Sequence, residues 1–170
     1  MKKVLTKILT FTLCICAVIG VTTNASAATI QPFAYLTDAQ HVRLNGTNKY
    51  MNALTTTSAV EGTKVSLYDL YEDDAAQKFY LRYGRLRNSS NNNLVVAMHM
   101  GTSEARFANQ NNVSDLAMIN LEENTSNGGK FSLESYDRYM GTYGTANASY
   151  VYFKPASDNT YNVWFFHKYN

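Results

Sequence analysis

The sequence predicts an all-β fold assembled from three copies of one structural unit. Its 170 residues include 13 tyrosines and 8 phenylalanines but only 2 prolines, and Val, Asn, Thr and Ser are abundant. This composition is typical of short strands joined by polar turns. No window shows a sustained helical period. In addition, the chain aligns with itself at a shift of about 40 residues, which indicates an internal repeat.

The clearest copy of the unit lies at residues 62–81, which form the pattern strand, polar turn, strand. Val65 and Leu67 fall on one face of an alternating segment. The acidic residues 72–74 interrupt the alternation, and Phe79 and Leu81 resume it. We therefore expect two strands separated by a solvated turn.

The N-terminus has the features of a secretion signal and is set apart from the fold. Lys2, Lys3 and Lys7 precede an apolar run at residues 8–21, and residues 25–27 are the small residues of a cleavage site. The apolar run is shorter than the roughly 20 residues that a membrane-spanning helix needs. We expect residues 1–27 to be a signal peptide, and the remaining chain to be secreted to the extracellular side.

Removal of this signal changes the chemistry of the chain. Cys14 and Cys16 leave with it, so the mature protein is expected to lack disulfides, a thiol nucleophile and a cysteine metal site. Of the 15 basic side chains, 12 remain without the three lysines, against 13 acidic ones, for a net charge of −1. No electrostatic argument for binding nucleic acid or for membrane insertion is left. The mature length fits one domain, expected at residues 41–170 after an N-terminal extension at residues 28–40.

Four strand-like segments recur in three repeats of about residues 41–83, 84–127 and 128–170. The first segments are residues 42–44, 85–87 and 131–133, and the second are residues 49–53, 93–97 and 138–142. The third segments are residues 65–68, 105–108 and 151–154, and the fourth are residues 77–79, 116–118 and 162–164. Polar, turn-forming stretches separate them.

Twelve short strands in three equal units are the pattern of a β-trefoil, with six strands in a barrel and six in a hairpin cap. One four-strand unit cannot bury its own apolar face, whereas three units around a pseudo-threefold axis pool these faces and protect their strand edges. A β-sandwich of seven to nine strands is the alternative that regular strand spacing also permits.

The end of the first repeat carries a family resemblance. Gln77 stands two residues before Phe79, and in a strand this spacing places both side chains on the same face. The stretch resembles the Gln-x-Trp signature of ricin-B-type β-trefoil lectins, whose aromatic residue enters the core beside a polar rim for a sugar. Trp164 takes the place of Phe79 in the third repeat. Both rings are therefore expected in the core.

The resemblance also implies where a sugar would bind. In ricin-type lectins, a pocket forms from an acidic residue after the second strand, an aromatic platform after the third, and an Asn-Gln pair before the closing aromatic. In repeat one these positions are Asn52, Tyr68, Ala76 and Gln77. An amide thus replaces the expected carboxylate, and Ala76 has no polar group. Tyr68 would stack on the sugar ring, while Asn52 and Gln77 would hydrogen-bond its hydroxyls.

The other two repeats match the ricin pattern less well. Repeat two has Val96 at the acidic position and no aromatic platform. Repeat three has Gly141 at the acidic position, followed by Lys154, Tyr161 and Asn162. The candidate carbohydrate-binding residues are therefore Asn52, Tyr68, Gln77, Lys154, Tyr161 and Asn162. Barrel and cap roles would explain Gln77, Tyr68 and Trp164 equally well.

Two function classes remain open. One is a carbohydrate-binding module with weak affinity, whose partners are glycans or glycoconjugates. The other is a protein-interaction trefoil, such as a protease inhibitor or a subunit paired with a separate toxin or hydrolase. The three histidines lack the spacing of a zinc motif, and residues 72–74 lack the glycine-centred spacing of a calcium loop. A glycosidase needs two carboxylates across a cleft, which a small trefoil does not provide. We expect no enzyme activity and no cofactor.

Overall fold

The computed structural model describes residues 36–53, 58–113, 115–123 and 129–167. The proposed signal peptide and both cysteines lie outside these residues. The described part contains two short 3-10 helices, η1 (Ala75–Gln77) and η2 (Asp115–Ala117). It also contains twelve strands: β1 (Leu36–Leu44), β2 (Tyr50–Asn52), β3 (Ser66–Tyr68), β4 (Lys78–Arg82), β5 (Arg85–Asn88), β6 (Leu94–Met98), β7 (Ala105–Asn109), β8 (Ile119–Glu123), β9 (Gly129–Leu133), β10 (Arg138–Thr142), β11 (Val151–Pro155) and β12 (Trp164–His167).

Six of these strands form a closed barrel. Antiparallel ladders join β5 to β4, β4 to β1, β1 to β12, β12 to β9 and β9 to β8. Between β5 and β8 the ring is completed by a single hydrogen bond of 2.8 Å, which the Ile119 N–H donates to the Gly84 carbonyl oxygen. The other four barrel strands, β4, β1, β12 and β9, each have a ladder partner on both edges.

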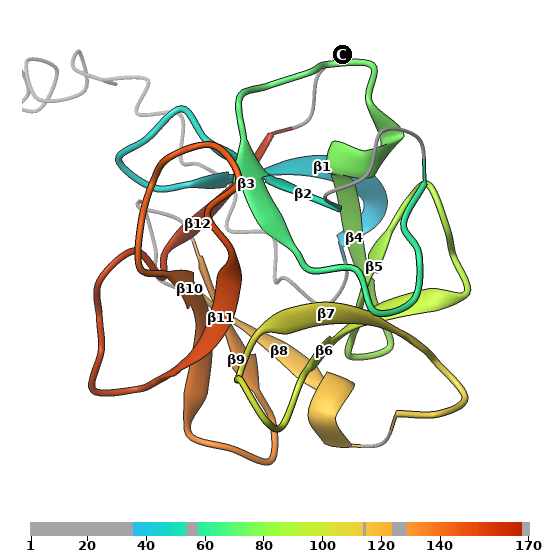
Figure 1. The fold of residues 1–170 in the computed structure, drawn as a ribbon, viewed down its shortest axis with the longest axis vertical. Coiled ribbons are helices and arrows are strands. Elements are labelled where there is room, and N and C mark those ends of the chain that lie inside the picture. The colour runs from blue at the N-terminus through green and yellow to red at the C-terminus, as the bar shows by residue number, and fades with distance from the viewer. Residues whose placement is uncertain (1–35, 54–57, 114, 124–128, 168–170) are drawn as a thin grey trace, which may run out of the picture. The chain divides into compact units, whose positions relative to one another are not determined.

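The other six strands form three hairpins, β2–β3, β6–β7 and β10–β11, which cap the barrel. Isolated bridges link the hairpins in all three combinations, at Lys64 with Arg106, Ser66 with Tyr150, and Glu104 with Tyr152. Figure 1 shows β3, β7 and β11 arranged around the centre of the view. This threefold arrangement is a β-trefoil, as the repeat pattern predicts, and it excludes the β-sandwich.

Apolar side chains from equivalent positions of the three repeats fill the core. The third strands contribute Leu67, Phe107 and Phe153, all of which are buried. The closing positions contribute Phe79, Ile119 and Trp164, which likewise have almost no exposed surface. The indole Nε1 of Trp164 donates a 2.9 Å hydrogen bond to the Met140 carbonyl oxygen. The prediction that Phe79 and Trp164 are core residues is confirmed.

The fourth segments of repeats one and two differ from the prediction because they begin as 3-10 helices. Gln77 ends η1, and the predicted strand residues 116 and 117 belong to η2. An aspartate side chain explains the first of these turns, since Asp74 Oδ1 accepts a 2.8 Å hydrogen bond from the Ala76 N–H. The first strand also begins earlier than predicted: β1 starts at Leu36, which pairs with Leu81, so residues 36–40 belong to the barrel.

Repeat two differs from the predicted alignment by one residue. The cross-strand pairs Trp164–Leu44, Phe79–Asn88 and Ile119–Leu133 are equivalent, so Asn88 occupies the position for which the alignment placed Arg87. The prediction is wrong here because a guanidinium would have to enter the core, which is costly without a partner. The same one-residue shift applies at two other positions of repeat two. Ile119, and not residue 118, is the closing core residue. Residue 97, and not residue 96, is the cross-strand partner of Arg106.

Candidate ligand-binding sites

In repeat one, Asn52 and Tyr68 belong to the two paired strands of the β2–β3 hairpin. Asn52 is nearly buried and pairs with Ser66, while the Tyr68 side chain is half-buried and pairs with Tyr50. The Ser66 hydroxyl is buried and has no hydrogen-bond partner among the described residues. The hairpin therefore offers an aromatic ring to the solvent, but little of the Asn52 amide.

Gln77 has a different role from the one expected for it. Its side chain is fully buried, Oε1 accepts a 2.7 Å hydrogen bond from the Tyr71 N–H, and Nε2 donates a 2.7 Å hydrogen bond to the Asp69 carbonyl oxygen. The expected hydrogen bond from Gln77 to a sugar is therefore wrong, because the backbone of residues 69–71 uses both ends of the amide. Gln77 instead fixes the loop that follows β3.

This loop presents two groups that the sequence analysis missed. The Tyr71 ring is 58% exposed, and the Asp69 side chain is 50% exposed. Lys49 Nζ lies 2.6 Å from Asp69 Oδ1, and Asn147 Nδ2 donates a 2.8 Å hydrogen bond to Oδ2. These hydrogen bonds, led by that from Lys49, lower the pKa of Asp69 below its ordinary value of 3.8. The carboxylate is thus held ionised and in a fixed orientation.

The sequence gives a local signal for Asp69 but none for its partner Asn147. Asp69 directly follows Tyr68, so an acidic residue beside the aromatic platform can be read from the sequence. Asn147 comes from repeat three, 78 positions away from Asp69. No local sequence pattern connects the two.

In repeat three, the candidate Lys154 is part of the interior and not of a ligand site. Its side chain is 0% exposed, and Nζ donates hydrogen bonds to the Thr142 and Thr160 carbonyl oxygens at 3.2 and 2.7 Å and to Thr160 Oγ1 at 2.9 Å. Nζ also lies 3.0 Å from Asp158 Oδ1. Hydrogen bonds from the Thr160 side chain and then from Lys154 lower the pKa of Asp158 to about 2.

The remaining candidates of repeat three surround the same side chain. A Cβ added at Gly141 would lie 2.8 Å from the Tyr161 carbonyl oxygen and 3.1 Å from Lys154 Cδ. Asn162 is buried, whereas the Tyr161 ring is exposed. The protein itself therefore fills the place where the resemblance implies a sugar. The expected ligand contacts of Lys154 and Asn162 are wrong for this reason, and Tyr161 is the one candidate here that can reach a ligand.

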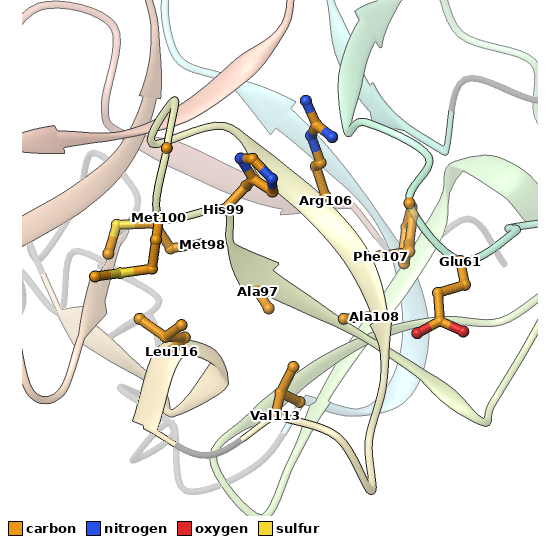
Figure 2. Close-up of a pocket in the computed structure, with 12 residues that line it drawn as sticks. Glu61, Ala97, Met98, His99, Met100, Arg106, Phe107, Ala108, Val113 and Leu116 are labelled. Atoms are coloured by element: carbon orange, nitrogen blue, oxygen red, sulfur yellow. The ribbon is translucent and has the colours of Figure 1, made fainter.

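A cavity lies in repeat two, where the sequence analysis named no candidate. It has a volume of about 380 Å³ and lies between the β6–β7 hairpin and the segment that leads into η2 (Figure 2). Ala97 and Ala108 form its floor. Strand register places Ala108 at the position of Tyr68 and of Lys154. Two alanines give no positive signal for a ligand site in a sequence.

Among the residues that the structure describes, no group of three or more His, Cys, Asp or Glu side chains is placed to hold a metal ion. Within the same residues, no helix is long and apolar enough to cross a membrane.

No protein-family model and no curated protein sequence matches the chain. Solved structures do match. ThreeFoil, a designed 3-fold symmetric protein, has a TM-score of 0.65 at 11% identity and covers 77% of this chain and 99% of its own. A mosquitocidal holotoxin has a TM-score of 0.67 at 16% identity over 78% of this chain. GalNAc-T7, solved with UDP, GalNAc and Mn²⁺, has a TM-score of 0.58 at 13% identity over 79%. The chain spans only 17% and 22% of these two proteins, and at such identities the likeness shows the fold alone.

Proposed function

We propose that this protein is a carbohydrate-binding β-trefoil module of the ricin-B-like kind, and that it binds sugars weakly through repeat one. The observation that carries the proposal is the pair of hydrogen bonds that the buried Gln77 amide makes with the loop of residues 69–71, one accepted from the Tyr71 N–H and one donated to the Asp69 carbonyl oxygen. They hold the Asp69 carboxylate and the exposed Tyr71 ring in place beside Tyr68. Structural neighbours that include a toxin and a protein solved with GalNAc support the same class of function.

The chemistry of this surface suits a polyol. A tyrosine ring can stack on the apolar C–H face of a pyranose, while the Asp69 carboxylate and the Asn147 amide can exchange hydrogen bonds with its hydroxyls. Each such hydrogen bond contributes about 0.5–1.5 kcal/mol net, and ring stacking contributes a similar amount. The sum corresponds to a Kd on the order of millimolar for one site. Useful avidity would therefore come from several copies of the chain on one multivalent glycan.

A glycan array followed by titration with the sugars that bind tests the proposal. Tyr68→Ala and Asp69→Asn should each abolish detectable binding and leave the melting temperature nearly unchanged. Tyr136→Ala is the matched control, because Tyr136 is also an exposed tyrosine but lies in repeat three. Gln77→Ala should lower both sugar binding and stability. Glycan binding that survives in the Tyr68→Ala and Asp69→Asn double variant would place the site elsewhere, with Tyr161 as the next residue to replace.

We further propose that the protein is secreted after cleavage behind residue 27, and that it acts without catalysis of its own. Mass spectrometry of the protein recovered from the medium should give a chain that begins at Ala28. A recovered chain that retains residues 1–27 would contradict the cleavage.

A protein-interaction trefoil is the second candidate, and one observation favours it. The pocket position of repeat three is closed by Lys154 and so cannot take a sugar. If a broad glycan array gives no signal, binding to a separate toxin or hydrolase subunit becomes the better reading, and analytical ultracentrifugation of the candidate pair would measure it.

A further inference from the structure

The cavity of repeat two exists because two small side chains stand where the other repeats have large ones. At the position of Ala108, repeat one has the Tyr68 ring and repeat three has the Lys154 side chain. In repeat three that side chain packs against Gly141 and fills the space. In repeat two only methyl groups project from the floor, so a hollow of about 380 Å³ stays open. This volume is at the small end of the range for ligand pockets.

One end of the hollow is apolar. Val113 and Leu116, which precede and enter η2, lie together at the end remote from Arg106 (Figure 2). The Met98 side chain and the floor residues Ala97 and Ala108 continue this surface. A sugar ring would find few hydrogen-bond partners here, whereas an aliphatic or aromatic group would gain by leaving water.

The other end of the hollow carries a guanidinium group. Arg106 and His99 line this end (Figure 2), and His99 Nδ1 lies 3.1 Å from Thr102 Oγ1. Arg106 Nε donates a 2.9 Å hydrogen bond to Glu104 Oε2, and Nη2 bonds the same oxygen. Nη1 donates no hydrogen bond within the described residues, so one edge of the guanidinium is free to meet an anion. The pocket is thus apolar at one end and carries a guanidinium at the other.

Two carboxylates, Glu104 and Glu61, balance the positive charges of Lys64 and Arg106 around the hollow. Glu104 also pairs with Lys64 at 2.7 Å, so the group of Lys64, Glu104 and Arg106 keeps one net positive charge. Glu61 lies at the side of the hollow, where its Oε1 accepts a 3.2 Å hydrogen bond from the Asn109 N–H. The experiment must therefore compare ligands of opposite charge.

We propose that this cavity binds a small carboxylic acid whose apolar part is compact, such as an aryl or branched aliphatic acid. The apolar part lies against Val113 and Leu116, and the carboxylate meets Arg106 Nη1. The site is separate from the sugar surface of repeat one, and its ligand differs in kind from a sugar.

Titration by NMR tests this assignment, with the methyl signals of Met98 and Met100 as reporters beside the pocket. The probes are 3-phenylpropionate, the neutral 3-phenylpropanol and the cationic 3-phenylpropylamine. The acid should shift the reporter signals in a saturable way, with a Kd at least tenfold lower than that of the alcohol or the amine. Equal or tighter binding of the alcohol or the amine overturns the proposal, as does the lack of saturable shifts with millimolar acid.

Variants locate the site. Ala108→Leu should abolish binding of the acid, and it should fold because the equivalent strand position holds large side chains in the other repeats. Ala146→Leu, at an exposed alanine in repeat three, is the matched control and should bind as the parent does. Undiminished acid binding in Ala108→Leu overturns the proposal. Tyr68→Ala should not affect this binding, which separates the test from that of the sugar site.

Discussion

Replacement of Glu104 by glutamine should destabilise the protein at neutral pH and have little effect near pH 2. Glu104 is only 6% exposed and lies where the three hairpins meet, since it forms the bridge to Tyr152. Its carboxylate pairs with Lys64 and Arg106 and accepts a 2.9 Å hydrogen bond from Thr102 Oγ1. Burial acts to raise the pKa of Glu104, but these three hydrogen-bonding partners outweigh it and lower the pKa from 4.5 to about 2.

The expected size of the effect follows from this pKa. Because the folded pKa is depressed, the stabilisation is fully present above the unfolded value of 4.5 and is lost as the pH falls through the folded value of about 2. A difference of roughly 2.5 pH units corresponds to at most about 3 kcal/mol in the free energy of unfolding. The gap between the parent and Glu104→Gln should shrink by more than half between pH 5 and pH 3.

Urea unfolding followed by tryptophan fluorescence measures this gap, because Trp164 is the only tryptophan of the chain and is buried. Glu134→Gln makes the same chemical change at an exposed carboxylate and should alter the free energy of unfolding by less than about 0.5 kcal/mol. A loss in Glu104→Gln that is the same at pH 7 and pH 2 would refute the reasoning, because it would then come from packing and not from charge.

Three further substitutions test the core and the filled pocket by the same urea assay. Trp164→Ala should cost about 3–5 kcal/mol, and a loss below about 1 kcal/mol would mean that the ring is not in the core. Asn88→Leu introduces the leucine that the other two repeats have at this position. It should still destabilise the protein by about 1–3 kcal/mol, because the Ala76 carbonyl oxygen loses the 2.8 Å hydrogen bond that Asn88 Nδ2 donates. A gain in stability would contradict this reasoning. Gly141→Ala should cost about 1–3 kcal/mol from the clash with the Tyr161 carbonyl, and an unchanged midpoint would show that the loop can move aside.

The trefoil could be predicted because the third strands keep one apolar pattern in all repeats. Val65, Ala105 and Val151 are equivalent in the alignment and are all fully buried in the structure. The register of β5 could not be read in the same way. Along β5, Arg85 and Arg87 point to one face of the strand, and Leu86 and Asn88 point to the other. The alternation alone does not say which face is turned to the core, but burying a guanidinium without a partner is costly. That cost selects the face with Leu86.

The candidate site was less predictable because the role of a polar side chain depends on its partners. Gln77 stands at the family position, but its partners are backbone groups of Asp69 and Tyr71, which no motif reveals. Lys154 looks like a surface residue in the sequence, and only the fold surrounds it with the oxygens of Thr142 and Thr160. Local chemistry thus indicated where polar groups gather, while long-range packing decided which of them remain accessible.

The pairing of β1 with β12 has a consequence for the order in which the protein folds. His41 pairs with His167, so strands separated by more than 120 positions must meet before the barrel closes. The three hairpins need only local contacts and can form early, whereas non-local pairing of this kind slows folding to about milliseconds or seconds. During synthesis, β1 and β8 each lack a neighbour until repeat three emerges, and open strand edges favour association between chains. We therefore expect the barrel to form only after the last strand is released from the ribosome.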